Sequence, residues 1–294
     1  MPSNHASTSS VTGLYPETIM CLSQQNQGWY ANLSLGFQRI AGKTVLAHRQ
    51  RKGPLAVQRP FYPEGPRCHL YVLHPPGGVV GGDRLAIDLD LAPEAEALIT
   101  TPGATKFYRS AGATAVQTQH IKLANNASLE WFPQENIFFP GANVQIKTQV
   151  DIETSARIAI WEIHCFGRPT TEEAFDTGYV DSSLQIIKSQ RPVVCERLRL
   201  NTDSRHRLSL MAGHPVVATL FISGVDETSL NRVRDLLPSM AHQHFSATLI
   251  EDMIVVRYLG DATDLAKQVF VTIWSALRLS VFGQAPTTPR IWNT

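Results

Sequence analysis

Three carboxylates, Asp83, Glu162 and Glu196, stand where an alternating strand pattern predicts an apolar face. Each is in phase with apolar residues of its own run, such as the leucines and isoleucine that follow Asp83 at every second position. A buried carboxylate without a partner is costly, so each must pair with a cation, accept hydrogen bonds, hold a proton or face internal water. Two interpretations stay open: structural ion pairs, or carboxylates that line an internal polar path.

The structural interpretation needs partners for these acids, and the sequence offers several polar and cationic candidates. Lys106 and Arg109 are three positions apart in residues 101–110, where Thr105 precedes them, and Arg168 lies in a later motif. These cations, or backbone amides, could neutralise the inward acids. On this interpretation Arg109→Ala leaves a buried charge unpaired and costs about 3–5 kcal/mol.

Residues 74–84, HPPGGVVGGDR, form the least ordinary stretch of the chain. Proline fixes φ and glycine allows positive φ, so the stretch predicts a tight, non-repetitive turn between strand-like runs at 68–73 and 83–91. Its amides could cradle an anion at residues 75–83, which is the basis of an alternative function as a small-molecule enzyme. Phosphate-binding loops open a helix, however, and strand periodicity follows here, so a structural turn is favoured. The turn glycines are Gly77, Gly78, Gly81 and Gly82.

Other residue types that could carry chemistry give weak signals. The four cysteines form no Cys-x-x-Cys pair, which argues against a zinc cluster or a disulfide scaffold and indicates reduced thiols. His242 and His244 could share a face of an extended segment but lack further ligands nearby, so a solvated segment is favoured. No local signature of a catalytic triad, dyad or metalloprotease is present, and we predict no catalytic residue and no tightly bound cofactor.

Composition limits the possible partners and location. Lys and Arg number 26 against 25 Asp and Glu, giving a formal charge of +1 that calls for neither nucleic acid nor an anionic membrane. We find no run of about 18 apolar residues, the length of a membrane span. The N-terminus lacks the basic start and apolar core of a signal peptide. We expect a soluble cytoplasmic protein with a disordered lead over residues 1–25.

The elements that must position these residues are mostly strands. Strand-like runs recur with no intervening helix long enough for a crossover, which points to an all-β body that could be a sandwich, a barrel or a β-helical stack. The runs lie at residues 29–37, 44–48, 68–73, 83–91, 95–101, 114–123, 128–132, 144–152, 157–166, 179–187 and 193–200.

The last third of the chain has a different pattern. A helix is predicted at 226–240, capped by Asp226, and strands at 246–250 and 254–259 follow it. A second helix starts near residues 261–264 and ends at Gly283. We therefore predict one domain over residues 26–294, made of a β body (26–222) and a C-terminal α+β lobe (223–294).

Several long motifs, in order, carry a resemblance to a known family. Besides the glycine turn they are GPLAVQRPFYPEG (53–65), TTPGATKFYRS (100–110), LEWFPQE (129–135) and GRP (167–169). With them, the chain closely resembles the urease accessory protein D (UreD) family from about residue 28 to residue 292. The resemblance implies a mainly β fold: an irregular β-helix-like stack of strands with a small helical element.

The resemblance also implies a function. It points to a non-enzymatic scaffold that binds urease apoprotein and accessory proteins F and G, self-associates or dimerises within the complex, and helps deliver nickel to apo-urease. Asp83, Glu162 and Glu196 match motif positions and are candidates for an internal nickel tunnel, although some members carry Asp where this chain has Glu162. Oxygen ligands spaced along a wall bind Ni²⁺ weakly, which suits transient transfer.

Overall fold

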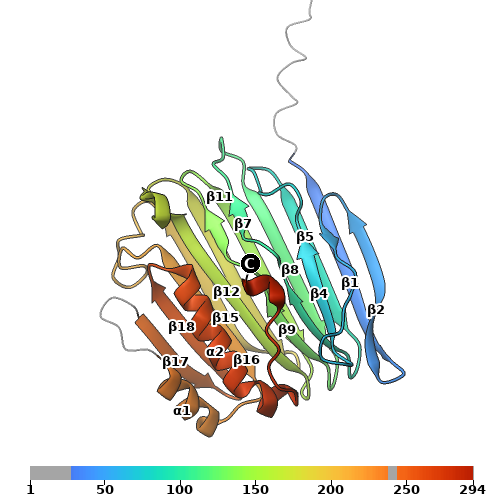
Figure 1. Ribbon diagram of the computed structural model, residues 1–294. Helices are drawn as coiled ribbons and strands as arrows, with labels where there is room; N and C mark the ends of the chain where they lie inside the picture. Colours follow the sequence, from blue (N-terminus) through green and yellow to red (C-terminus); the bar gives the residue numbers. More distant parts are fainter. Residues whose placement is uncertain (1–27, 238–243, 294) are drawn as a thin grey trace, which may run out of the picture.

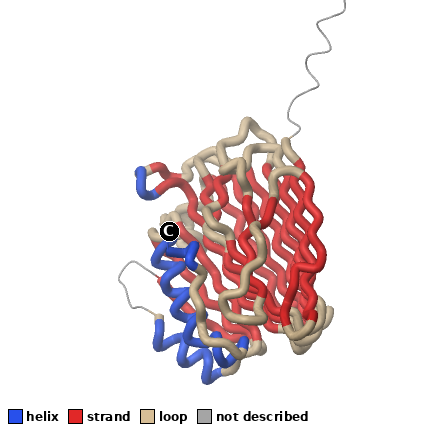
Figure 2. The backbone as a smooth tube through the Cα atoms, turned by 45° about the vertical axis from the view of Figure 1, so that its right-hand side comes forward, coloured by secondary structure: helices blue, strands red, loops and turns tan. Residues whose placement is uncertain are grey.

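Two β-sheets stacked face to face form most of the chain, and two α-helices cover part of one sheet (Figures 1 and 2). The computed structural model describes residues 28–237 and 244–293. The predicted lead, residues 1–25, and the predicted end of the first helix at residue 240 lie outside this part.

The first sheet has seven strands in the order β15-β14-β11-β8-β5-β1-β2. Its central strands run parallel to one another, while β2 and β15 pair antiparallel at the two edges. The strands are β1 (Tyr30–Ile40), β2 (Lys43–Lys52), β5 (Arg84–Leu91), β8 (Ala115–Leu123), β11 (Asn143–Ile152), β14 (Tyr179–Lys188) and β15 (Arg191–Asn201).

The second sheet has eleven strands, with β17-β18-β16-β12-β9-β6-β4-β3 as its main path. Three short strands complete this sheet: β10 and β13 pair with β12, and β7 pairs with β10. The strands are β3 (Ala56–Val57), β4 (Cys68–Leu73), β6 (Glu96–Thr100), β7 (Thr105–Phe107), β9 (Ser128–Phe132), β10 (Asn136–Phe138), β12 (Arg157–Arg168), β13 (Glu173–Ala174), β16 (Val216–Ser223), β17 (His244–Ile250) and β18 (Met253–Gly260).

The chain alternates between the sheets, so that each coil adds one strand to each. The β4-β6-β9-β12 series is parallel, as is the β1-β5-β8-β11-β14 series opposite it. This arrangement confirms the mainly β, β-helix-like stack with two α-helices. The predicted strand runs are present, whereas β16 and the short strands β3, β7, β10 and β13 were not predicted.

Alternation explains which faces are buried. In β8 buried residues occupy every second position and point between the sheets, while the intervening side chains face outward. β12 is buried on both faces, because α2 (Thr263–Phe282) covers the side turned away from the first sheet. This is why a continuous apolar run, rather than alternation, marks β12 in the sequence.

Both predicted C-terminal helices form, but the first ends at Leu236, followed by an extended Leu237, and not at residue 240 as predicted. α1 (Glu227–Leu236) begins after Asp226, whose side chain accepts a hydrogen bond from the Ser229 amide at 2.8 Å, as expected of an N-cap. α2 ends at Gly283, which takes φ +70°. The strands of the predicted lobe, β17 and β18, are hydrogen-bonded through β18 to β16 in the second sheet. The division of the chain at residue 222 stays a prediction.

α2 is also the single helix in the described chain that length and composition alone would allow to cross a membrane. A core helix satisfies the same criterion, and α2 buries an apolar stripe against the second sheet. No apolar run of this length was found in the sequence, since Asp264, Lys267 and Arg278 interrupt it.

A buried ion network, not predicted from the sequence, fastens α2 to the sheet. Arg278 of α2 donates from Nε to Glu130 Oε1 at 2.8 Å and from Nη2 to Glu64 Oε2 at 2.6 Å. Arg67 Nη1 lies 3.1 Å from Glu130 Oε2, and both of these side chains are fully buried. The arginines and glutamates balance each other's charge, which a buried network requires.

Candidate functional site

The candidate site is a polar row that crosses the space between the two sheets. On the first sheet, inward-facing residues are lateral neighbours across β8, β11, β14 and β15: Gln119, Thr148, Leu184 and Glu196. On the second sheet the matching neighbours on β12, β16 and β18 are Glu162, Thr219 and Arg257. Two contacts join the rows: Thr148 Oγ1 donates to Glu162 Oε1 at 2.8 Å, and Arg257 pairs with Glu196.

Glu162 is the central carboxylate of this row. Its side chain is 16% exposed, and burial raises its pKa to about 7, with further repulsion from Glu196 opposed by the Thr148 hydroxyl. His164 Nε2 lies 3.8 Å from Glu162 Oε2. Burial lowers the pKa of His164 to about 4, so this imidazole is neutral at neutral pH and does not balance the charge of Glu162.

Two cavities meet at Glu162. The first, here called the turn cavity, has about 430 Å³ and lies between the glycine turn and Glu162. The second, the edge cavity, has about 310 Å³ and lies between Glu162 and the Glu196–Arg257 pair. Glu162 lines both cavities, so any route from the turn to the β15 edge through them passes this carboxylate.

A buried acceptor without a protein partner also lines the turn cavity. Gln119 Oε1 is one of two buried side-chain atoms that lack a hydrogen-bond partner in the described chain. Gln119 is the lateral neighbour of Thr148, which itself bonds Glu162. Because buried polar atoms are normally satisfied, this acceptor indicates a place for a water molecule or an ion. The described residues contain no cluster of three or more His, Cys, Asp or Glu side chains that could hold a metal tightly.

Asp83 lies apart from the other two predicted carboxylates. It is buried at the end of the glycine turn, where Oδ1 accepts from the Trp29 amide at 2.8 Å and Oδ2 from the Val80 amide at 3.0 Å. It is absent from the lining of both cavities. The structure therefore brings Glu162 and Glu196 together and gives Asp83 backbone amides as partners, one of the options foreseen.

The cations expected to neutralise these acids do not do so. Lys106 and Arg109 are exposed and make no ion pair in the described chain, although Lys106 also contributes to the lining of the turn cavity. Arg168 pairs with Glu173 at the surface, and its guanidinium lies 5.0 Å from the centre of the Phe139 ring. The predicted ion pairs of the inward acids with Arg109 and Arg168 are therefore wrong. Without such a pair, there is no reason to expect Arg109→Ala to lower the folding stability strongly. Thr105, at the start of β7, lines the turn cavity.

The glycine turn itself is a tightly packed connection between β4 and β5. A Cβ at Gly78 would lie 2.1 Å from Tyr108 Cε2, and one at Gly81 would lie 2.2 Å from Ser110 Oγ. Gly77 and Gly82 take φ values of +77° and +95°. This packing against residues 108–110 leaves little space for side chains at Gly78 and Gly81.

Most amides of this turn donate hydrogen bonds within the protein. The Gly77 amide donates to His74 O at 3.3 Å, the Val79 amide to Lys106 O at 2.7 Å and the Gly82 amide to Thr114 O at 3.2 Å. The Val80 amide donates to Asp83. An anion at the turn would have to displace these bonds, so the geometry does not favour an anion cradle.

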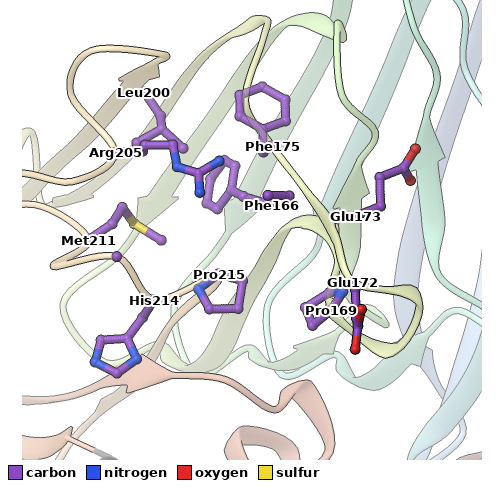
Figure 3. A pocket seen from close by; sticks show the side chains of 12 residues that line it. Phe166, Pro169, Glu172, Glu173, Phe175, Leu200, Arg205, Met211, His214 and Pro215 are labelled. Atoms are coloured by element: carbon purple, nitrogen blue, oxygen red, sulfur yellow. The ribbon is translucent and has the colours of Figure 1, made fainter.

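A separate pocket of about 220 Å³ lies beyond the end of β12 (Figure 3). Phe166, Phe175 and Met211 give it apolar surface, and the charged side chains of Glu172 and Arg205 also line it. None of the predicted site residues lines this pocket, and it shares no lining residue with the polar row.

Sequence reasoning missed Arg257, Thr148, His164 and Gln119. Arg257 shares a face of β18 with Met253, Val255 and Leu259, so the rule that selected Glu196 would also have selected it if it had been applied to cations. The hydroxyl and amide residues carry no comparable signal, because Thr and Gln occur freely on strands. Only the lateral register of the sheets reveals them as one row.

Comparison with known proteins agrees with the motifs found in the sequence. The family model for "UreD urease accessory protein" matches residues 30–293. A relative named urease accessory protein UreD, from Klebsiella pneumoniae subsp. pneumoniae, is 44% identical over 268 residues, which cover 91% of this chain and 96% of the relative. Another of the same name, from Pseudomonas putida, is 44% identical over 272 residues, which cover 92% of this chain and 97% of the relative. A third, from Aliivibrio fischeri, is 40% identical over 284 residues, covering 93% of this chain and 99% of its own. The chain belongs to the UreD urease accessory protein family.

Proposed function

We propose that this chain is a non-enzymatic, cytoplasmic urease maturation factor that binds urease apoprotein and accessory proteins F and G and passes nickel through its polar row. Family membership supports the role in urease maturation. The three described cysteines are free, which fits a reducing compartment. The observation that carries the nickel path is the uncompensated carboxylate of Glu162 at the junction of two cavities.

These buried and half-buried carboxylates differ in how their negative charge is balanced. Glu130 is held by guanidinium groups, Asp83 by backbone amides, and Glu196 by Arg257. Glu162 has only a hydroxyl and a neutral imidazole beside it. A cation entering the cavities therefore gains more from Glu162 than from the other carboxylates, and it can displace the proton that burial favours there.

The donor set suits passage rather than storage. Glu162 offers carboxylate oxygens, and Thr148 and Gln119 offer neutral oxygens nearby. Few and mainly oxygen ligands hold Ni²⁺ weakly, and the cavities have room for the waters that complete its shell. Beyond Glu162 the ion meets the Glu196–Arg257 pair, which must open for it to leave at the β15 edge.

The small-molecule enzyme has no comparable support, because most amides of the glycine turn are bonded within the protein. The Asp83 part of the predicted path is also not required by this proposal. We place Asp83 in the turn that forms one wall near the turn cavity, and Glu162 and Glu196 along the route itself.

The test is Glu162→Gln in a host that expresses urease and the other maturation proteins. The substitution keeps the volume and an acceptor for Thr148 but removes the charge that attracts a divalent ion. We expect recovery of apo-urease and protein F in pull-downs to persist while the nickel content of urease falls. Glu153→Gln, at an exposed position, is the matched control. Normal nickel content, or loss of the complex together with nickel, would return Glu162 to a structural role.

Glu196→Gln extends the same test to the far end of the row. Its charge balances Arg257, so its removal leaves a guanidinium facing the edge cavity. We expect nickel content to fall while the complex assembles. Loss of both, or of neither, contradicts a transport role for Glu196.

A further inference from the structure

Positive charge is concentrated in one short segment of this chain. Residues 39–63 contain six Lys and Arg and no Asp or Glu, although the whole chain has a formal charge of only +1. The rest of the sequence holds 20 Lys and Arg against 25 Asp and Glu, so it is net acidic. The six residues are Arg39, Lys43, Arg49, Arg51, Lys52 and Arg59.

This charge lies along an unpaired sheet edge. β2 is the last strand of the first sheet, and β1 is its only strand partner in the described chain (Figure 1). Every residue from Ala47 to Lys52 is exposed, so both faces of this half of β2 are in solvent. The hydrophobic core therefore does not account for the choice of residues here.

A groove of about 1080 Å³ runs between β2 and residues 58–62. Val45, Leu46 and Phe61 contribute apolar surface to it, while Lys43, Arg49 and Arg59 line it with positive charge. Lys43 Nζ lies 3.4 Å from the centre of the Tyr62 ring, which holds this cation at the groove.

Most of these cations have no acidic partner within the protein. Among the described residues, only Arg39 of the six makes an ion pair, with Glu96 at 3.4 Å. Five positive charges thus face solvent along one edge. Like charges so placed repel one another and favour an acidic ligand.

Edge protection is the simpler explanation of charge on β2. Lys and Arg side chains and strand irregularities keep edges from pairing, and the β1–β2 register does shift between Gly36 and Phe37. Protection does not require Arg59 on a neighbouring segment, however, nor an apolar groove between that segment and the strand. The combination of groove, apolar floor and unbalanced charge indicates a ligand.

We propose that β2 and residues 58–62 bind an extended, acidic segment of a partner protein. Its carboxylates would face Arg49, Arg51 and Arg59, and its alternating apolar side chains would lie on the floor of the groove. An extended segment along a strand edge presents side chains alternately, which matches charged and apolar surfaces on its two sides. This surface is independent of the polar row and of nickel.

The probe is a fluorescent twelve-residue peptide of alternating Glu and Val, titrated with the full chain in an anisotropy assay. We expect saturable binding that weakens as salt rises, because exposed charges are screened. Arg49→Glu should weaken binding by at least about tenfold, as reversal of a charge at an interface does. Arg232→Glu, the same reversal on the exposed face of α1, should leave it unchanged.

Several outcomes would overturn the proposal. Equal binding of a Lys-Val peptide, or equal weakening by both variants, would show that the groove does not recognise acidic side chains. Tighter binding of a DNA duplex or of vesicles containing phosphatidylserine would assign the charge to nucleic acid or to a membrane. Arg49 lies in the exposed half of β2, Ala47 to Lys52, so its substitution tests binding without disturbing the core.

Discussion

From the raised pKa of Glu162 we predict how the folding stability of the chain depends on pH, which can be tested without urease. Burial raises this pKa to about 7, so the folded chain prefers the protonated carboxyl whereas the unfolded chain ionises it near the ordinary value of 4.5. A group of this kind stabilises the fold fully below 4.5, and its contribution is lost as the pH rises through 7. Glu162→Gln, which is neutral at every pH, should remove this dependence.

The magnitude follows from the two pKa values. A difference between about 7 and 4.5 corresponds to about 3 kcal/mol of free energy between the protonated and ionised forms. At pH 4.5 and below, wild type and Glu162→Gln should unfold with similar free energies, because both side chains are neutral. Above pH 8 the variant should be the more stable by up to about 3 kcal/mol. The Thr148 hydrogen bond survives in the variant and does not contribute to this difference.

The assay is urea unfolding of the full chain and of the variant at intervals from pH 4.5 to pH 8.5. Glu153→Gln controls for the loss of one formal charge at an exposed position. The decisive quantity is the difference between variant and wild type as a function of pH. A difference that stays constant across the range, or that favours wild type at high pH, refutes the claim that Glu162 is a destabilising carboxylate in the folded chain.

Two further predictions concern residues that hold the fold together. Arg278→Met should lower the free energy of unfolding by about 3–5 kcal/mol, because Glu130 and Glu64 lose a buried guanidinium. Arg109→Ala at the surface should change it by less than about 0.5 kcal/mol. Equal urea midpoints for the two variants would contradict this prediction. Asp83→Ala should cost about 1–3 kcal/mol, because the Trp29 and Val80 amides lose their acceptor. Asp90→Ala on the exposed face of β5 is its control, and an equal cost for both variants would show that the turn does not depend on the carboxylate.

The alternation of apolar and polar residues predicted the strands well, because this alternation depends only on which face of each strand is buried. β5, β8 and β11 show this alternation directly in the sequence. Their arrangement did not follow from it, since sandwiches, barrels and stacks share the same alternation. Parallel pairing joins β5 to β8 and β8 to β11 across segments that pass through the other sheet, and the family resemblance was needed to anticipate it.

The sequence predicted that the candidate acids point toward the interior, but it did not predict their partners. Glu162 and Glu196 point between the sheets as alternation requires. Arg257, which pairs with Glu196, lies 61 residues away in the sequence and meets it only across the two sheets. Motif proximity suggested Arg109 and Arg168 instead. Glu130 was missed for the converse reason: it faces α2, which closes over the outer side of β9 and buries a residue that alternation alone would leave in solvent.

Glu130 and Glu162 show how one fold keeps two buried carboxylates for different ends. Glu130 carries full compensation: two arginines surround it, and the Trp274 indole donates to it at 2.6 Å, so an additional cation would gain little there. The ionised Glu162 carboxylate destabilises the fold, and it accepts only one hydrogen bond, from the Thr148 hydroxyl. Residues that break the local rules of burial without compensation are expected where function requires them. On that argument the cation route follows the least compensated carboxylate rather than the most deeply buried one.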